Sequence, residues 1–105
     1  MKKIKVQLEY RCFPIWLYDE NGNLIDNDFP ASLIGDPEID PIFVQLQEQF
    51  DALYLDDGCE FRYIGFADDI AKQHFKVEFL HAMKRLLKKA TGLYYIENGV
   101  NLEEL

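Results

Sequence analysis

The sequence predicts a two-layer α+β domain, in which two helices pack on one face of a mostly antiparallel sheet of four to five strands. Three observations predict this class. The chain has 105 residues, the usual size of one domain, and 49% of them are hydrophobic, enough for one core. Two segments have helical periodicity, and several short segments alternate or are apolar in the manner of strands. These elements follow in the order βββαβαβ, within a single domain that spans residues 1–105.

The first two strands are expected at residues 2–12 and 15–19. The first alternates between apolar and polar side chains, which is typical of a strand with one face in water. The second is apolar at four successive positions, which favours cover on both faces. Asn21-Gly22 predicts a type I′ turn, so the second strand should pair with residues 23–26. The acidic residues around this turn also allow a calcium loop, although their spacing does not fit an EF-hand.

The first helix is expected at residues 41–55. Asp36-Pro37 and Asp40-Pro41 each combine an acid suited to an N-cap with a proline suited to the first helical position. Because a proline cannot bond back inside a helix, we expect a single turn at the first pair and the helix at the second. The apolar side chains of this helix share one arc: Ile42, Phe43, Leu46, Phe50, Leu53 and Tyr54.

A further strand is expected at residues 59–66, and a long second helix runs from Asp68 and Asp69 to about Ala90. Lysines and an arginine crowd the last turns of this helix, where they oppose the negative end of its dipole. Gly92 is placed to end it. A short strand at residues 93–97 and a loosely held chain end follow. The predicted buried arc of the second helix comprises Phe75, Phe79, Leu80, Ala82, Met83, Leu86, Leu87 and Ala90.

Acidic residues are concentrated in the middle of the chain. Residues 19–69 contain fourteen acidic residues and one basic residue, Arg62, while the whole chain has a net charge of −8. This disfavours binding to nucleic acid, because phosphates are bound by clustered Lys and Arg. It favours a basic protein partner or simple solubility. The expected partner-binding residues are the acids of the predicted loop and first helix: Asp36, Glu38, Asp40, Glu48, Asp51, Asp56 and Asp57.

Neither a membrane span nor a signal peptide is indicated. No apolar run is long enough to cross a bilayer, and the basic start is followed by an alternating segment where a signal peptide needs a continuous apolar one. A cytoplasmic protein is therefore expected. Cys12 and Cys59 match no zinc spacing and are interpreted as reduced thiols inside strands.

Three side chains of the second helix are candidates for chemistry, since His74, Glu78 and His81 share one helical face. They allow a metal site or an acid and base pair. A solvated face with local ion pairs is the preferred interpretation, since the neighbouring cations would repel a metal and no fourth ligand is indicated. A cysteine and histidine nucleophile pair has no supporting flanking sequence, and the glycines are too isolated for a phosphate loop. We therefore expect a non-enzymatic protein without metal or cofactor.

The run from Tyr10 to Asp28, YRCFPIWLYDENGNLIDND, resembles a segment of small, uncharacterised acidic proteins of Gram-positive bacteria. In size and acidity the whole chain is similar to immunity proteins that neutralise toxic nucleases. This resemblance implies an immunity or antitoxin-like inhibitor that covers the basic surface of a partner such as a nuclease toxin. It assigns no role to any individual residue.

Two other functions stay open from the residues alone. One is a self-associating structural or regulatory domain, in which Lys84, Arg85 and Lys88 of the second helix meet the acidic middle of another copy in a homodimer. The other is a small enzyme that uses His74 and His81.

Overall fold

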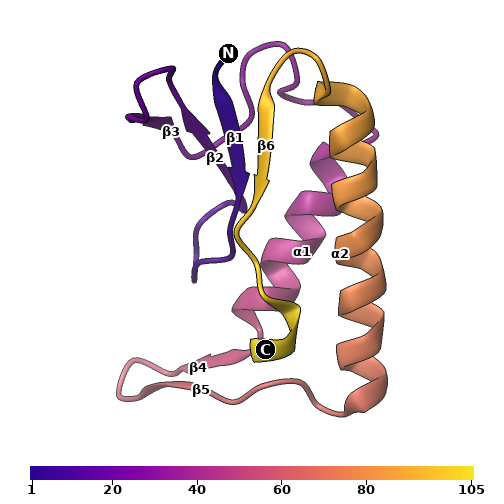
Figure 1. Ribbon diagram of the computed structural model, residues 1–105. Coiled ribbons are helices and arrows are strands. Elements are labelled where there is room, and N and C mark those ends of the chain that lie inside the picture. The colour runs from indigo at the N-terminus through magenta and orange to yellow at the C-terminus, as the bar shows by residue number, and fades with distance from the viewer.

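The computed structural model describes residues 1–105, which form a four-stranded sheet, two helices on one face of it and a separate two-stranded hairpin (Figure 1). The strand order is β3-β2-β1-β6. β1 (Lys3–Val6) pairs antiparallel with β2 (Ile15–Tyr18) and parallel with β6 (Tyr95–Asn98), and β3 (Leu24–Asp26) pairs antiparallel with β2. The predicted α+β class with a mostly antiparallel sheet is confirmed. The parallel pairing places the first and last strands of the chain side by side.

The core lies between the sheet and the helices and contains eighteen buried hydrophobic residues. β1 and β2 contribute the inward-facing side chains of Ile4, Val6, Ile15 and Leu17. On the other face of the sheet, Lys3 and Lys5 each lie 3.6 Å from a carboxylate oxygen of Glu97 on β6. Since Trp16 and Tyr18 on that face are half-buried, the predicted cover on both faces of β2 is wrong.

β1 is shorter than the alternating pattern predicts, because the chain turns back between Val6 and Ile15. Arg11 has a φ of 57°, a left-handed conformation that a residue with a side chain seldom adopts. The backbone N–H of Gln7 donates to the carbonyl of Pro14 at 3.0 Å, which closes the loop. Apolar and polar residues continue to alternate through this loop without a glycine, so periodicity alone does not reveal the turn.

The β2–β3 hairpin is confirmed, but its turn differs from the predicted one. Only Gly22 has a positive φ, at 83°, whereas a type I′ turn needs positive φ at two successive residues. Asp19 instead closes a wider turn, because its carboxylate accepts hydrogen bonds from the backbone N–H groups of Asn21 and Asn23, both at 2.9 Å.

α1 (Asp40–Asp51) ends four residues before the predicted position. The single turn expected before it is confirmed, since the carbonyl of Asp36 accepts hydrogen bonds from the N–H groups of Ile39 and Asp40. Asp40 does not cap the helix: the N-cap is Ile39, without a side-chain hydrogen bond. The carboxylate of Asp36 supports the preceding turn by accepting the N–H of Glu38 at 2.8 Å.

α2 (Asp69–Ala90) has the predicted bounds. Asp68 is its N-cap and accepts the N–H of Ala71 at 2.8 Å, and Gly92 follows its end with a φ of 87°. The predicted buried arc is wrong at two positions, because Leu80 and Leu87 are exposed. They lie beside the buried Met83, at the edge of the core-facing arc of α2.

The strand predicted at residues 59–66 is present but shorter, at residues 61–63, and it belongs to a hairpin that does not join the main sheet. β4 (Tyr54–Asp56) and β5 (Phe61–Tyr63) pair antiparallel and extend away from the two helices (Figure 1). The carbonyl of Leu53 accepts hydrogen bonds from the N–H groups of Ile64 and Gly65 and so closes the base of the hairpin. The turn at Asp57 and Gly58 reverses the chain, so that β5 pairs with β4 and not with a strand of the main sheet.

The end of the chain is packed rather than loose. Residues Leu102–Glu104 form the short 3₁₀ helix η1, and Leu102 and Leu105 pack against the core. The ammonium nitrogen of Lys76, on α2, forms an ion pair with a carboxylate oxygen of Glu103 at 3.1 Å. This packing brings η1 beside the base of the β4–β5 hairpin (Figure 1).

Candidate functional site

Six of the seven predicted partner-binding acids lie at the two ends of α1. Asp36, Glu38 and Asp40 are at its start; Asp51 ends it, and Asp56 and Asp57 belong to the β4–β5 hairpin. Glu48 lies exposed on the helix between the two groups. Twelve residues at 1.5 Å each make α1 about 18 Å long, so the acids form two separate groups.

The first group is partly neutralised within the molecule. Lys89, near the end of α2, lies 3.2 Å from Asp36 and 3.4 Å from Glu38, and Arg85 donates to the carbonyl of Glu38 at 3.4 Å. The pKa of Asp36 is lowered, chiefly because its carboxylate accepts the N–H of Glu38 and next by its contact with Lys89. The hydrogen bond to Asp36 raises the pKa of Lys89. These contacts fasten the start of α1 to the end of α2.

The second group surrounds the β4–β5 hairpin and keeps an excess of negative charge. Residues 48–63 contain five acidic residues and only one basic residue, Arg62. Arg62 lies 3.1 Å from Glu60, and the neighbouring Arg11 lies 4.0 Å from Asp56. These two cations do not balance the five carboxylates, so this end of the molecule is acidic.

Backbone N–H groups hold the acids of the hairpin turn in place. Asp57 accepts hydrogen bonds from Cys59 at 3.0 Å and Glu60 at 2.8 Å, and Asp56 accepts one from Gly58 at 3.3 Å. The first two bonds lower the pKa of Asp57. Asp51 accepts the backbone N–H of Arg11 at 2.8 Å and thereby fastens the 7–14 loop to the end of α1.

Four aromatic side chains form a cluster on the face of the hairpin that meets the 7–14 loop. Tyr54 and Phe61 are stacked with their ring planes 2° apart, and Tyr10 packs on both at centroid distances of 5.1 and 4.9 Å. Tyr63 meets Tyr54 edge-on at 5.3 Å. Phe61 is 56% exposed and Tyr63 46%, although both are large aromatic residues. We call Tyr10, Tyr54, Phe61 and Tyr63 the aromatic cluster.

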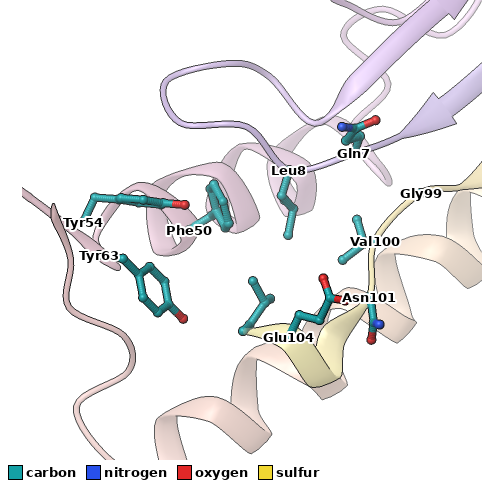
Figure 2. Close-up of a pocket in the computed structure, with 10 residues that line it drawn as sticks. Gln7, Leu8, Phe50, Tyr54, Tyr63, Gly99, Val100, Asn101 and Glu104 are labelled. Atoms are coloured by element: carbon teal, nitrogen blue, oxygen red, sulfur yellow. The ribbon is translucent and has the colours of Figure 1, made fainter.

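A pocket of about 330 Å³ adjoins the aromatic cluster at the base of the hairpin. Figure 2 shows side chains of Leu8, Phe50, Tyr63 and Glu104 arranged around one common space. Tyr54 and Tyr63 belong to both the cluster and the pocket. The pocket therefore combines apolar and aromatic walls with the carboxylate of Glu104.

The other residues considered for chemistry do not form a site. His74 and His81 are exposed and Glu78 is half-buried, and no group of three His, Cys, Asp or Glu side chains is placed to hold a metal ion. Cys12 and Cys59 are free thiols. Cys59 is exposed in the hairpin turn, so its predicted place inside a strand is wrong, because the acidic turn extends to this residue.

Sequence reasoning missed the aromatic cluster and the pocket. The sequence predicts Tyr10 in the first strand and Tyr54 in the first helix. In the structure β1 ends at Val6 and α1 ends at Asp51, before either residue. One signal was available: Tyr54 precedes Asp57-Gly58, a favoured hairpin dipeptide, and aromatic residues stand at alternate positions after it, at Phe61 and Tyr63. The pocket needs residues from four distant segments, which no local pattern joins.

Comparisons with known protein families, curated proteins and solved structures found no match for this chain. No helix is long and apolar enough to cross a lipid bilayer.

Proposed function

We propose that the protein is a non-enzymatic binding protein whose aromatic cluster and surrounding acids engage a basic protein partner. The observation that carries this proposal is the exposure of Phe61 and Tyr63 on a projecting hairpin with an excess of carboxylates. Large aromatic side chains are the usual anchors of protein interfaces. Charges around such anchors that are opposite in sign to those of the partner speed association and make it selective.

The pocket provides a place for one cationic side chain of the partner. The aliphatic stem of a lysine or arginine would pack between Leu8, Phe50 and Tyr63. Its charged end would meet the carboxylate of Glu104, in a charge-assisted hydrogen bond that is stronger than a neutral one. Apolar and aromatic walls, with the amides of Gln7 and Asn101 and the carboxylate of Glu104, suit a cation better than an anion.

Only part of the predicted acidic surface supports this proposal. Asp36 and Glu38 share an ion pair with Lys89, which offsets one of their two negative charges. Asp51, Asp56 and Asp57, with Glu48 nearby, remain beside the hairpin. The proposed surface is therefore the distal end of α1 and the hairpin, rather than the whole of the acidic middle.

The particular role we propose is an immunity or antitoxin-like inhibitor in the cytoplasm, which covers the basic active-site surface of a nuclease toxin. Its support is the acidity and size of the chain, together with a surface in which steering charges and aromatic anchors lie together. Nuclease active sites bind phosphates and are accordingly basic. An acidic surface with exposed rings suits such a target.

The experiment that tests the proposal starts with the product of the neighbouring gene, or with a basic nuclease captured by the tagged chain. Its affinity is measured by calorimetry at 0.01 and 0.15 M salt, where the Debye length falls from about 30 to about 8 Å. We expect binding to weaken steeply with salt, and the nuclease to lose activity when bound. Affinity that does not change between the two salt concentrations would contradict the proposed surface.

A matched pair of variants locates the contact. Glu60→Gln, in the hairpin, and Glu20→Gln, in the β2–β3 turn, remove the same charge from two exposed sites at different ends of the molecule. We expect the first to slow association and the second to leave it nearly unchanged. Equal effects of both would show that only the net charge matters.

A further inference from the structure

One side of α2, outside its buried arc, carries a row of exposed apolar side chains. Ile70 is 81% exposed, Val77 50%, Leu80 59% and Leu87 44%. Their spacings of seven, three and seven residues place them along one side of the helix. We call Ile70, Val77, Leu80 and Leu87 the outer row. Isolated exposed apolar residues are common, but several in a row along one side of a helix are the pattern of a helix interface.

The outer row follows a heptad repeat. With Ile70 at position a, the a positions are Ile70, Val77 and Lys84, and the d positions are Gln73, Leu80 and Leu87. Apolar residues at a and d are the seam of a two-helix coiled coil. Two of the six positions are polar, and such residues at the seam commonly fix the register and orientation of the pair.

The same row is nearly symmetric when it is read backwards. Reversal about the point between Glu78 and Phe79 exchanges Ile70 with Leu87 and Val77 with Leu80. It also exchanges Gln73 with Lys84, a pair able to form a hydrogen bond. A second copy of α2 running antiparallel would therefore present an apolar residue opposite every apolar residue of the first.

Charge along α2 favours the antiparallel arrangement over the parallel one. Its N-terminal end carries Asp68 and Asp69, whereas its C-terminal end exposes Lys84, Arg85 and Lys88. An antiparallel pair places the acidic end of one helix beside the basic end of the other, in line with the two helix dipoles. A parallel pair places like ends together and sets Lys84 against Lys84 within the seam.

We propose that a second copy of this chain covers the outer row, with the two α2 helices packed antiparallel about a twofold axis at Glu78 and Phe79. A self-complementary surface of this kind generates a closed dimer. An apolar groove of about 680 Å³ adjoins the start of the row and is lined by Ile64, Phe66 and Ile70. In this arrangement the C-terminal end of the partner helix lies beside this groove. The exposed Leu93, which follows that helix, lies there too. This inference is independent of the proposed function, because the β4–β5 hairpin extends away from α2.

Sedimentation equilibrium tests the dimer with the full chain. We expect the wild type to dimerise, and Val77→Glu or Leu80→Glu to weaken dimerisation at least tenfold with an unchanged far-ultraviolet circular dichroism spectrum. Leu24→Glu is the matched control, since Leu24 is 53% exposed on β3 at the opposite edge of the sheet. It should leave the dimer intact. A wild type that stays monomeric at millimolar concentration, or a dimer that persists in both α2 variants, would overturn the proposal.

Chemical cross-linking tests the orientation. In a Cys59→Ser background, which removes the exposed native thiol, Ile70→Cys and Leu87→Cys are made as separate chains of different mass. With a short bis-maleimide we expect cross-links between the two kinds of chain when they are mixed. Two Ile70 positions of an antiparallel pair lie seventeen residues apart along the axis, about 26 Å, so the first variant alone should not cross-link. Self-linking of that variant in place of mixed linking would overturn the antiparallel register.

Discussion

The ring of Tyr54 stacks on the ring of Phe61 across the β4–β5 hairpin, with the centroids 5.3 Å apart. Tyr10, from a loop more than forty residues earlier in the chain, packs on both rings. The hairpin is short and lies outside the main sheet, and an isolated two-stranded hairpin is marginal in water. The aromatic contacts therefore hold it in shape, and a surface ordered before binding loses less entropy when a partner arrives.

Phe61→Ala is expected to weaken partner binding by about 30-fold, equivalent to about 2 kcal/mol, because central aromatic anchors dominate interface energies. The fold should persist, since Phe61 is 56% exposed and lies outside the core. Affinity is measured by calorimetry and stability by thermal melting. Leu24→Ala removes a similarly exposed apolar side chain from β3 and should bind as the wild type does. If both variants bind equally well, the aromatic cluster is not the contact surface.

Much of the fold was predictable because its signals are local. The caps and periodicity of α2 defined its bounds, since Asp68 and Gly92 act within a few residues of the helix ends. The aromatic cluster was not predictable, because it depends on where Arg11 turns the chain with a backbone conformation that its residue type does not signal. The division of the predicted acids between the two ends of α1 was not predictable for a related reason. Only tertiary packing brings Lys89 to Asp36 and leaves Asp57 without a cation.

The pH dependence of stability should reflect three carboxylates that accept backbone N–H bonds. Asp19, Asp36 and Asp57 have pKa values lowered chiefly by the N–H groups of Asn23, Glu38 and Cys59, respectively. In the unfolded chain their pKa is about 3.9. The stability that they contribute is therefore present above that value and is lost as the pH falls through their lower folded pKa values. Urea unfolding between pH 7 and pH 2.5 should show this loss beginning near pH 4.

Asp57→Asn isolates one of these carboxylates. The amide oxygen still accepts the hydrogen bonds of the turn, but it does not titrate. We expect a smaller loss of stability between pH 5 and pH 3 than in the wild type, measured by the same urea titrations. An identical pH profile would show that Asp57 has the same pKa in the folded and unfolded chains.

Asp68→Ala should destabilise the protein by about 1 kcal/mol, because it removes the side-chain acceptor of the first turn of α2. Asp68→Asn is the matched control, since asparagine is an equally good N-cap and removes the same charge. Chemical denaturation of both variants separates the hydrogen bond from the charge. If the asparagine variant loses as much stability as the alanine variant, the charge at the helix dipole is the larger contribution.

Glu104→Gln tests whether the pocket takes a cation. Its neighbour Glu103 provides the control, because Glu103→Gln makes the same change in net charge at a residue that pairs with Lys76 at 3.1 Å and does not line the pocket. We expect Glu104→Gln to weaken partner binding about tenfold, or about 1.4 kcal/mol, and Glu103→Gln to change it little. Raising the salt should shrink the loss, since Glu104 is exposed and its pairing with a cation is screened by salt as at other surface sites. Equal losses from the two variants would mean that the partner senses only the overall charge of the chain end, and the pocket would then have no part in binding.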